Sequence, residues 1–229
     1  MTVNRGSEKK ISLCINNEGL SLFLTALLHE WGFSVFPSCP ENPDELLLAE
    51  ENCSRCAEHR KRVDLINSAY FDSDQVNMPI VLEQLWRVLE KNYHLPPRHH
   101  LRLTVDLPIT MEIRGQEQPG RLTSLSTAGA RLSLPRELAV GEPFPIVLPL
   151  PQRTLQLTAK VIYVTTFPDS ANRYDAGVLF ERISGADKAL LRDTIILSFF
   201  SSIRPHLPRW AFEVGINQFD LSPELRKRL

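Results

Sequence analysis

Leu101-Arg102-Leu103-Thr104-Val105-Asp106-Leu107 alternates apolar and polar side chains without interruption. An alternation with a period of two is typical of a β-strand that has one buried and one solvated face. The double proline Pro96-Pro97 stands just before this segment and ends the helical pattern that precedes it. The chain therefore changes at this point from a helical periodicity to a strand periodicity.

The strand pattern continues well beyond Leu107. Ile109, Met111 and Ile113 carry the alternation past Pro108, and residues 115–120 are predicted to form a polar turn. The further expected strands are Arg121–Ser124, Ala130–Leu134, Phe144–Leu148, Thr154–Val164 and Asp175–Phe180. Short strands separated by glycine, proline and asparagine turns indicate an antiparallel barrel or sandwich.

A helix is predicted directly after these strands. Ser184 has the side chain of a helix N-cap, and Lys188–Phe200 places Leu191, Ile195 and Phe199 on one face. A helix with one apolar face can cover one end of a barrel.

The segment before the double proline alternates between strand and helix. Gly19–Trp31 places its apolar side chains on one helical face, and Gly32 ends that helix. Strands are predicted over Lys10–Ile15, Phe33–Phe36 and Val63–Asn67, and two further helices over Asp44–Glu58 and Pro79–Tyr93. This order predicts an α/β unit with a parallel sheet and right-handed crossovers.

Composition and charge exclude several classes of function. The chain is 43% hydrophobic and 23% charged with a net charge of -1, which is typical of a soluble globular protein and argues against broad binding to nucleic acid or anionic membrane. No apolar run approaches the roughly 20 residues of a membrane span, and the first ten residues lack a secretory signal, so we expect a cytoplasmic protein without membrane insertion. No activated nucleophile or acid–base pair stands out, so an enzyme is not expected.

Four cysteines, Cys14, Cys39, Cys53 and Cys56, lie in the first quarter of the chain. In a cytoplasmic protein they are expected to be reduced thiols. Cys53 and Cys56 have the spacing of zinc sites and redox centres, with His59 three residues further on and Cys39 as the only other obvious ligand. Because no second CxxC exists and the surrounding residues predict a polar helix, we predict neither a metal nor a cofactor.

Two arginines and a hydroxyl-rich segment form a candidate binding site. Arg98 and Arg102 lie between the double proline and the first strand, which excludes a helix and leaves them on a linker that can close over a ligand. A guanidinium group can pair with guanine O6 and N7 or with a phosphate, and its flat face can stack on a base. Ser124-Leu125-Ser126-Thr127-Ala128-Gly129 adds two serine hydroxyls and a glycine, which we expect to adopt a backbone conformation closed to other residues.

These landmarks, together with Gly177-Val178-Leu179-Phe180, resemble the PilZ family, whose members sense the bacterial second messenger cyclic di-GMP. The resemblance covers residues 98 to about 200 and implies a six-stranded antiparallel barrel followed by a helix. It also implies a cyclic di-GMP site formed by Arg98, Arg102, Ser124, Ser126 and Gly129. The family has Asp or Asn at the position of Ser124. A hydroxyl makes one weaker contact where a carboxylate accepts two hydrogen bonds, which predicts weakened but retained binding.

Residues 10 to 93 resemble the receiver domains of two-component response regulators in their first strand, first helix and second strand. Receivers carry an acidic pair after the first strand, and this chain has Asn16-Asn17-Glu18 there. The stretch at the end of the predicted third strand is Asn67-Ser68-Ala69-Tyr70, without a phosphoacceptor aspartate. Too little chain remains before the last helix for two more strands. We therefore expect a shortened, receiver-like module that is not phosphorylated and that contacts other proteins.

The sequence thus predicts three segments: a degenerate receiver-like α/β domain over residues 8–94, a PilZ-type barrel over 95–200, and a C-terminal extension over 201–229. Apolar residues of the extension, such as Phe212 and Phe219, are expected to pack within the chain, and the alternative is a partner surface around Trp210 and Phe212. The expected function is a cyclic di-GMP effector that relays binding to an unidentified protein partner. The alternative is an adaptor that has lost ligand binding. A homodimer is compatible with the sequence, and nucleic acid is not an expected partner.

Overall fold

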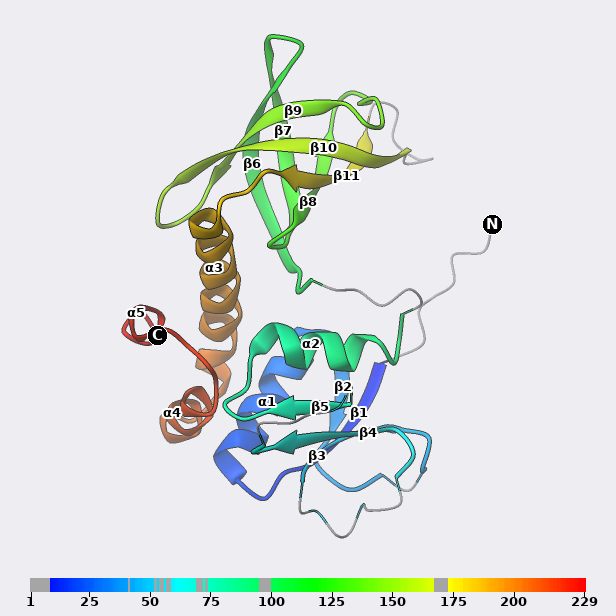
Figure 1. Ribbon diagram of the computed structural model, residues 1–229, viewed down its shortest axis with the longest axis vertical. Helices are drawn as coiled ribbons and strands as arrows, with labels where there is room; N and C mark the ends of the chain where they lie inside the picture. The colour runs from blue at the N-terminus through cyan, green and yellow to red at the C-terminus, as the bar shows by residue number, and fades with distance from the viewer. Residues whose placement is uncertain are drawn as a thin grey trace. The chain divides into compact units, whose positions relative to one another are not determined.

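The N-terminal unit is built on a sheet of five parallel strands (Figure 1). The computed structural model describes residues 9–40, 42–51, 53, 56, 59–68, 72, 74–94, 100–166 and 173–229. The strands are β1 (Lys9–Cys14), β2 (Phe33–Phe36), β3 (Leu46–Glu50), β4 (Arg62–Ile66) and β5 (Gln75–Asn77), in the spatial order β2-β1-β3-β4-β5. This is the order of flavodoxin-like sheets. The predicted α/β unit with a parallel sheet is confirmed.

Helix α1 (Glu18–Glu30) connects the first two strands as predicted. The side chain of Asn17 caps it by accepting a hydrogen bond from Leu20 N at 3.0 Å. Gly32 ends it with a φ of 80°, a left-handed conformation that favours glycine. Helix α2 (Leu82–Glu90) is shorter than the predicted Pro79–Tyr93.

Two predictions for this unit are wrong. The stretch predicted as a helix over Asp44–Glu58 contains β3, in which Leu46, Leu47, Leu48 and Ala49 are all buried. Successive side chains of a strand point to opposite faces of the sheet, so the burial of all four residues shows that both faces of β3 are covered, which is why its sequence is continuously apolar instead of alternating. The prediction also left no room for further strands, yet β4 is followed by β5 within the same sheet.

The wrong helix prediction also hid an acidic residue at the end of a strand. The third strand along the chain is β3, and it ends at Glu50. The Glu50 carboxylate accepts hydrogen bonds from Asn16 Nδ2 at 2.8 Å and from Asn17 N at 3.4 Å. The end of the third strand therefore carries an acidic residue, held by amide donors from the segment after β1.

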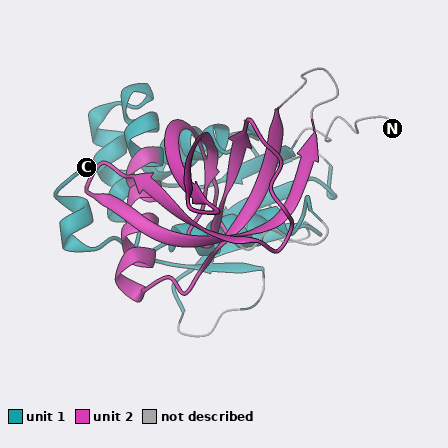
Figure 2. Cartoon of the chain, turned by 90° about the horizontal axis from the view of Figure 1, so that it is seen from above, with its two compact units in different colours: residues 1–99, 199–229 teal, residues 100–198 magenta. Residues whose placement is uncertain are grey.

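The C-terminal segment packs into the N-terminal unit. Helix α3 (Gly185–Ile203) is followed by a short 3₁₀ turn, α4 (Arg209–Asn217) and α5 (Pro223–Arg226). Residues 1–99 and 199–229 form one compact unit, and residues 100–198 form the other (Figure 2). In the first unit the Phe23 ring contacts the rings of Phe200, Phe212 and Phe219, with centroids 5.1, 5.7 and 5.2 Å apart. The expected packing of the extension within the chain is confirmed, although Trp210 remains 47% exposed.

Six antiparallel strands close into a barrel in the second unit, in the order β10-β11-β8-β7-β6-β9. They are β6 (Leu103–Ile113), β7 (Gln116–Leu125), β8 (Gly129–Leu134), β9 (Pro143–Pro149), β10 (Thr154–Thr166) and β11 (Tyr174–Glu181). The barrel interior is filled by apolar side chains, among them the fully buried Leu122, Leu132, Ile146 and Leu148. The predicted six-stranded barrel followed by a helix is confirmed.

The turn between β6 and β7 is tighter than predicted. Only Arg114 and Gly115, with φ angles of 54° and 74°, separate the two strands, and the expected turn residues 116–120 already belong to β7. At the start of α3, Ser184 Oγ accepts a hydrogen bond from Asp187 N at 3.1 Å, as expected of a cap. Within the described ranges, no helix is long and apolar enough to cross a membrane.

Candidate functional site

Of the two predicted linker arginines, the structure describes only Arg102. Arg98 lies outside the described residues, as does His99. Arg102 directly precedes β6 and is exposed, while its neighbour Leu101 is buried. Among the residues that the structure describes, Arg102 forms no ion pair or hydrogen bond, so its guanidinium group is available to a ligand.

A row of outward-facing residues crosses five neighbouring strands beside Arg102. Residues that lie directly opposite each other in an antiparallel ladder point to the same face. The pairing register joins Thr104 (β6), Ser124 (β7), Arg131 (β8), Gly177 (β11) and Tyr163 (β10) in this order. The predicted site residue Ser124 therefore lies on the outer face of the barrel, and of these five only Ser124 and Gly177 stood out in the sequence.

Tyr163 supplies an aromatic surface at one end of this row. A Cβ atom added to Gly177 would lie 2.1 Å from Tyr163 Cε1, so the ring rests on the glycine backbone. Tyr163 is still 43% exposed. A ring that is fixed on one side and open on the other is suited to stacking on a nucleobase.

The second motif forms a tight turn between β7 and β8. The buried Ser126 hydroxyl accepts hydrogen bonds from Ala128 N at 3.3 Å and Gly129 N at 3.2 Å, and it donates to Gly129 O at 3.0 Å. Thr127 Oγ1 lies 3.4 Å from His100 Nδ1, which ties the turn to the residues that lead into β6. Ser126 therefore shapes the turn with a hydroxyl group that is already satisfied.

Gly129 is required for a reason that the sequence did not indicate. Its φ is not among the positive values in the chain, so the expected special backbone conformation is wrong. A Cβ atom at this position would instead lie 2.1 Å from the carbonyl oxygen of Val178 in β11. The glycine allows β8 and β11 to approach each other beside the turn.

The charges on this outer face are mostly positive. Arg121 donates to Asp106 at 2.6 Å, and this hydrogen bond holds the pKa of the Asp106 carboxyl below its ordinary value. Arg131 forms an ion pair with the buried Asp175. Arg102 also lies on this face, as does Arg173, which donates to Ser133. Together with Arg121 and Arg131 this gives four arginines, compared with the two aspartates Asp106 and Asp175. A chain with a net charge of -1 therefore has a local surface that attracts anions.

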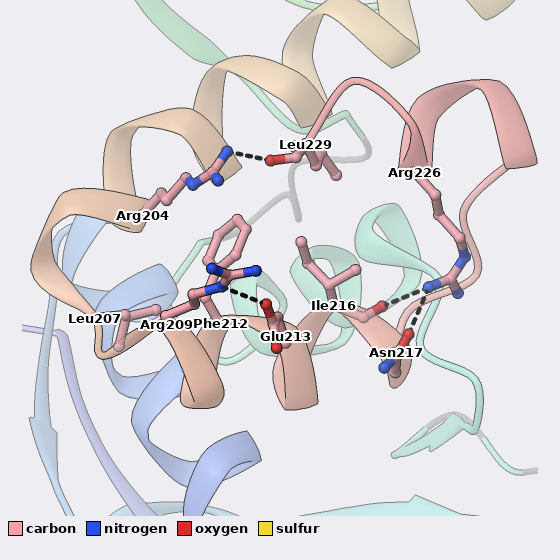
Figure 3. A pocket seen from close by; sticks show the side chains of 9 residues that line it. All are labelled: Arg204, Leu207, Arg209, Phe212, Glu213, Ile216, Asn217, Arg226 and Leu229. Carbon is pink, nitrogen blue, oxygen red and sulfur yellow. Dashed lines mark hydrogen bonds and ion pairs between the residues drawn. The ribbon is translucent and has the colours of Figure 1, made fainter.

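A hollow of about 490 Å³ lies within the C-terminal segment and also contains arginines (Figure 3). Arg226 donates to Ile216 O and to Asn217 Oδ1, both at 3.2 Å. Arg209 donates to Glu213 at 2.7 Å, and Arg204 donates to the Leu229 carbonyl group. These guanidinium groups hold the C-terminal segment together, so we regard the outer face of the barrel as the stronger candidate site.

One family model and several solved structures match part of this chain. The PilZ domain family model matches residues 96–196. Among solved structures, the chain is similar to the PilZ domain of YcgR from Escherichia coli with c-di-GMP, at 22% identity over 48% of this chain and 95% of that chain, with a TM-score of 0.39. It is also similar to MotI/DgrA, the inhibitor of motility of Bacillus subtilis, at 20% identity over 43% of this chain and 49% of that chain, with a TM-score of 0.38.

A further similarity is to MrkH in its c-di-GMP complex from K. pneumonia, at 12% identity over 47% of this chain and 55% of that chain, with a TM-score of 0.42. This chain thus spans about half the length of MotI/DgrA and of MrkH. No curated protein matches the chain.

Proposed function

Because the PilZ domain family model matches residues 96–196, we propose that the protein is an effector that binds cyclic di-GMP on the outer face of its barrel. The observation that carries this proposal is the exposed Arg102, which has no partner among the described residues and stands beside the outward-facing row that contains Ser124 and Arg131. Guanidinium groups offer a cyclic dinucleotide both of the contacts that its guanines and phosphates need.

We assign the residues as follows. Arg98 and Arg102 contact guanine or phosphate from the linker, and Ser124 contributes one hydroxyl contact. Ser126 and Gly129 act indirectly, because they fix the turn that presents Ser124. Neighbouring strands lie about 4.8 Å apart, so the outward-facing Ser124 and Arg131, which are paired on adjacent strands, can contact one ligand together.

Relay to a partner protein is part of the proposal. The contact between Thr127 and His100 joins the turn to the residues that lead into β6. A ligand that contacts both the turn and the linker would favour one linker conformation over others, which is a population shift. The receiver-like α/β unit would then present the altered surface to a partner protein.

The first prediction is that wild-type protein binds cyclic di-GMP in isothermal titration and that Arg102→Ala weakens the binding. Loss of a hydrogen bond to a charged group costs about 1.5–3 kcal/mol, which raises Kd by roughly one to two decades. Arg98→Ala is expected to behave in the same way. Arg136→Ala is the matched control, because it removes the same charge from an exposed residue beyond the other end of β8 and should leave Kd unchanged.

Two outcomes would count against this assignment. A wild-type protein that gives no heat at high micromolar cyclic di-GMP does not bind the ligand. Equal losses of affinity in Arg102→Ala and Arg136→Ala would show that only net charge matters.

The second prediction is that Ser124→Asp tightens binding by roughly tenfold. A carboxylate at this position can accept two hydrogen bonds from a guanine edge where the hydroxyl offers one contact. Thr104→Asp places the same charge on the directly opposite residue and is expected to leave Kd unchanged or to raise it. If both variants weaken binding equally, Ser124 is not at a guanine-reading position.

A second candidate function is a ligand-independent adaptor with the same fold. It is favoured by the serine at position 124 and by the Ser126 hydroxyl, which is satisfied within its own turn. An adaptor would give no binding heat with the wild type, and Ser124→Asp would restore at most weak binding.

A further inference from the structure

Four cysteine thiols meet at the carboxyl edge of the parallel sheet, although they are far apart in the sequence. Cys14 ends β1, Cys39 follows β2, and Cys53 and Cys56 follow β3. In a parallel sheet these strand ends lie along one edge, where α/β proteins place their ligand sites. The sequence suggested Cys39 as a companion to the CxxC pair but gave no reason to add Cys14.

The four sulfur atoms lie within 4.8 Å of one another. Individual Sγ–Sγ distances are 2.8 Å for Cys14–Cys53, 3.2 Å for Cys14–Cys39 and 3.7 Å for Cys53–Cys56. Cys39 and Cys56 are 2.6 Å apart. Zn–S bonds of about 2.3 Å at tetrahedral angles place sulfur atoms roughly 3.8 Å apart, so a small expansion of this cluster would accommodate the ion.

From this convergence we propose that Cys14, Cys39, Cys53 and Cys56 form a structural zinc site with four thiolate ligands. Three of these thiols are buried and Cys39 is partly buried, so the site is closed to substrates and has no open position for catalysis. Soft sulfur ligands in a tetrahedral arrangement select zinc over the hard cations magnesium and calcium.

Arg62 is not a zinc ligand, but it contacts the backbone of two of the proposed ligands. Its guanidinium group donates to Cys56 O at 3.0 Å and to Cys53 O at 3.3 Å, and also to the carbonyl groups of Glu50 and Glu51. It therefore holds the backbone of the CxxC turn in place. Arg62 Nε also forms an ion pair with Asp64 at 2.6 Å, so the support that Arg62 gives to the cluster is the fixed backbone of the turn.

The connections around the cluster also favour a structural ion. Parallel strands are usually joined by a helix that packs on the sheet. The described residues between β2 and β3 and between β3 and β4 form no α-helix, and each of these connections carries ligands of the cluster. Zinc would attach both connections to the end of β1.

Zinc binding has a defined proton balance. Burial raises the pKa of the Cys56 thiol to about 11 and also raises the pKa of the Cys14 thiol. One Zn²⁺ ion that binds four thiols forms four Zn–S bonds and releases four protons to solvent, with no change in oxidation state. His59 is not needed, because its Nε2 donates to Glu45 O at 2.9 Å.

The test is metal analysis of the full chain, purified under reducing conditions from cells grown with zinc. We expect one zinc ion per chain, and loss of that ion in Cys14→Ser and Cys39→Ser. His59→Ala is the matched control, since it removes the nearby imidazole and should keep the full zinc content. Replacement of zinc by Co²⁺ in the wild type should give sulfur-to-cobalt charge-transfer bands and the visible bands of a tetrahedral site.

Cobalt spectra of the wild type keep the proposal testable even if a cysteine variant fails to fold. A zinc-free protein whose four thiols react freely would overturn the proposal, as would a mass that shows disulfides. Iron in place of zinc, or a cobalt spectrum without sulfur ligands, would also overturn it. None of these outcomes depends on cyclic di-GMP, so they are independent of the titration that tests the proposed function.

Discussion

Gly129→Ala is expected to destabilise the barrel by at least about 3 kcal/mol and to abolish cyclic di-GMP binding at temperatures where the variant unfolds. The added Cβ atom would lie 2.1 Å from the carbonyl oxygen of Val178 and 3.2 Å from Leu179 Cα. Both are backbone atoms of the paired strand β11, so no side chain can rotate away. The two strands must separate, and the separation breaks the ladder beside the turn.

Gly185→Ala is the matched control. Gly185 begins α3, and an added Cβ atom would meet no atom within 4 Å. Alanine is the better helix former, so this variant should be unchanged or more stable by up to about 1 kcal/mol. Urea unfolding of both variants measures the difference, and equal midpoints would show that β11 can move aside at Gly129.

The barrel was predictable because its signal is local. Alternating side chains between Leu101 and Ile113 identify a half-buried strand even though Pro108 interrupts it. Strand β9 pairs with β6 only at Thr110 and Met111, so the proline lies outside that ladder. The β6–β7 turn was placed wrongly because Gln116–Gly120 has a turn-like composition, whereas the positive φ angles belong to Arg114 and Gly115.

The parallel sheet was less predictable because its centre is defined by contacts between distant segments. Leu46–Ala49 is continuously apolar, which fits a helix or a fully buried strand equally well until its neighbours are known. Because β3 was predicted as part of a helix, the sequence did not indicate the cysteine cluster. A helix over Asp44–Glu58 would have separated Cys53 and Cys56 from Cys14, which the actual turn after β3 brings together.

The ligand contacts of the candidate site residues stay a prediction, and the structure adds what two of them do within the fold. The Ser126 hydroxyl forms the turn, and Gly129 allows a close approach of two strands instead of adopting the special conformation that was expected. Arg131 was missed because only the register places it opposite Ser124, and Tyr163 was missed because only the register places it opposite Gly177 in the same row. A sequence pattern shows which side of a strand faces outward, but not which strands are neighbours.

Lys9→Met is expected to destabilise the N-terminal unit by about 3–5 kcal/mol. The Lys9 ammonium group forms an ion pair with Glu90, whose side chain is fully buried at the end of α2. Lys9 Nζ also lies 5.1 Å from the centroid of the Phe33 ring and 5.6 Å from that of Trp86. Without the ammonium group, the Glu90 carboxylate keeps only His94 Nε2 at 3.0 Å as a counter-group among the described residues.

Two further variants separate loss of the ion pair from loss of a charge. Lys10→Met removes the same charge from the exposed neighbouring residue and should cost less than about 1 kcal/mol. Lys9→Met combined with Glu90→Leu removes the stranded carboxylate, and replacement of both members of a buried pair by apolar groups is often neutral. The double variant should therefore recover most of the stability in urea unfolding. A double variant as unstable as the sum of Lys9→Met and Glu90→Leu would show that the two residues are not coupled, and that the loss in Lys9→Met comes from the aromatic contacts of its side chain.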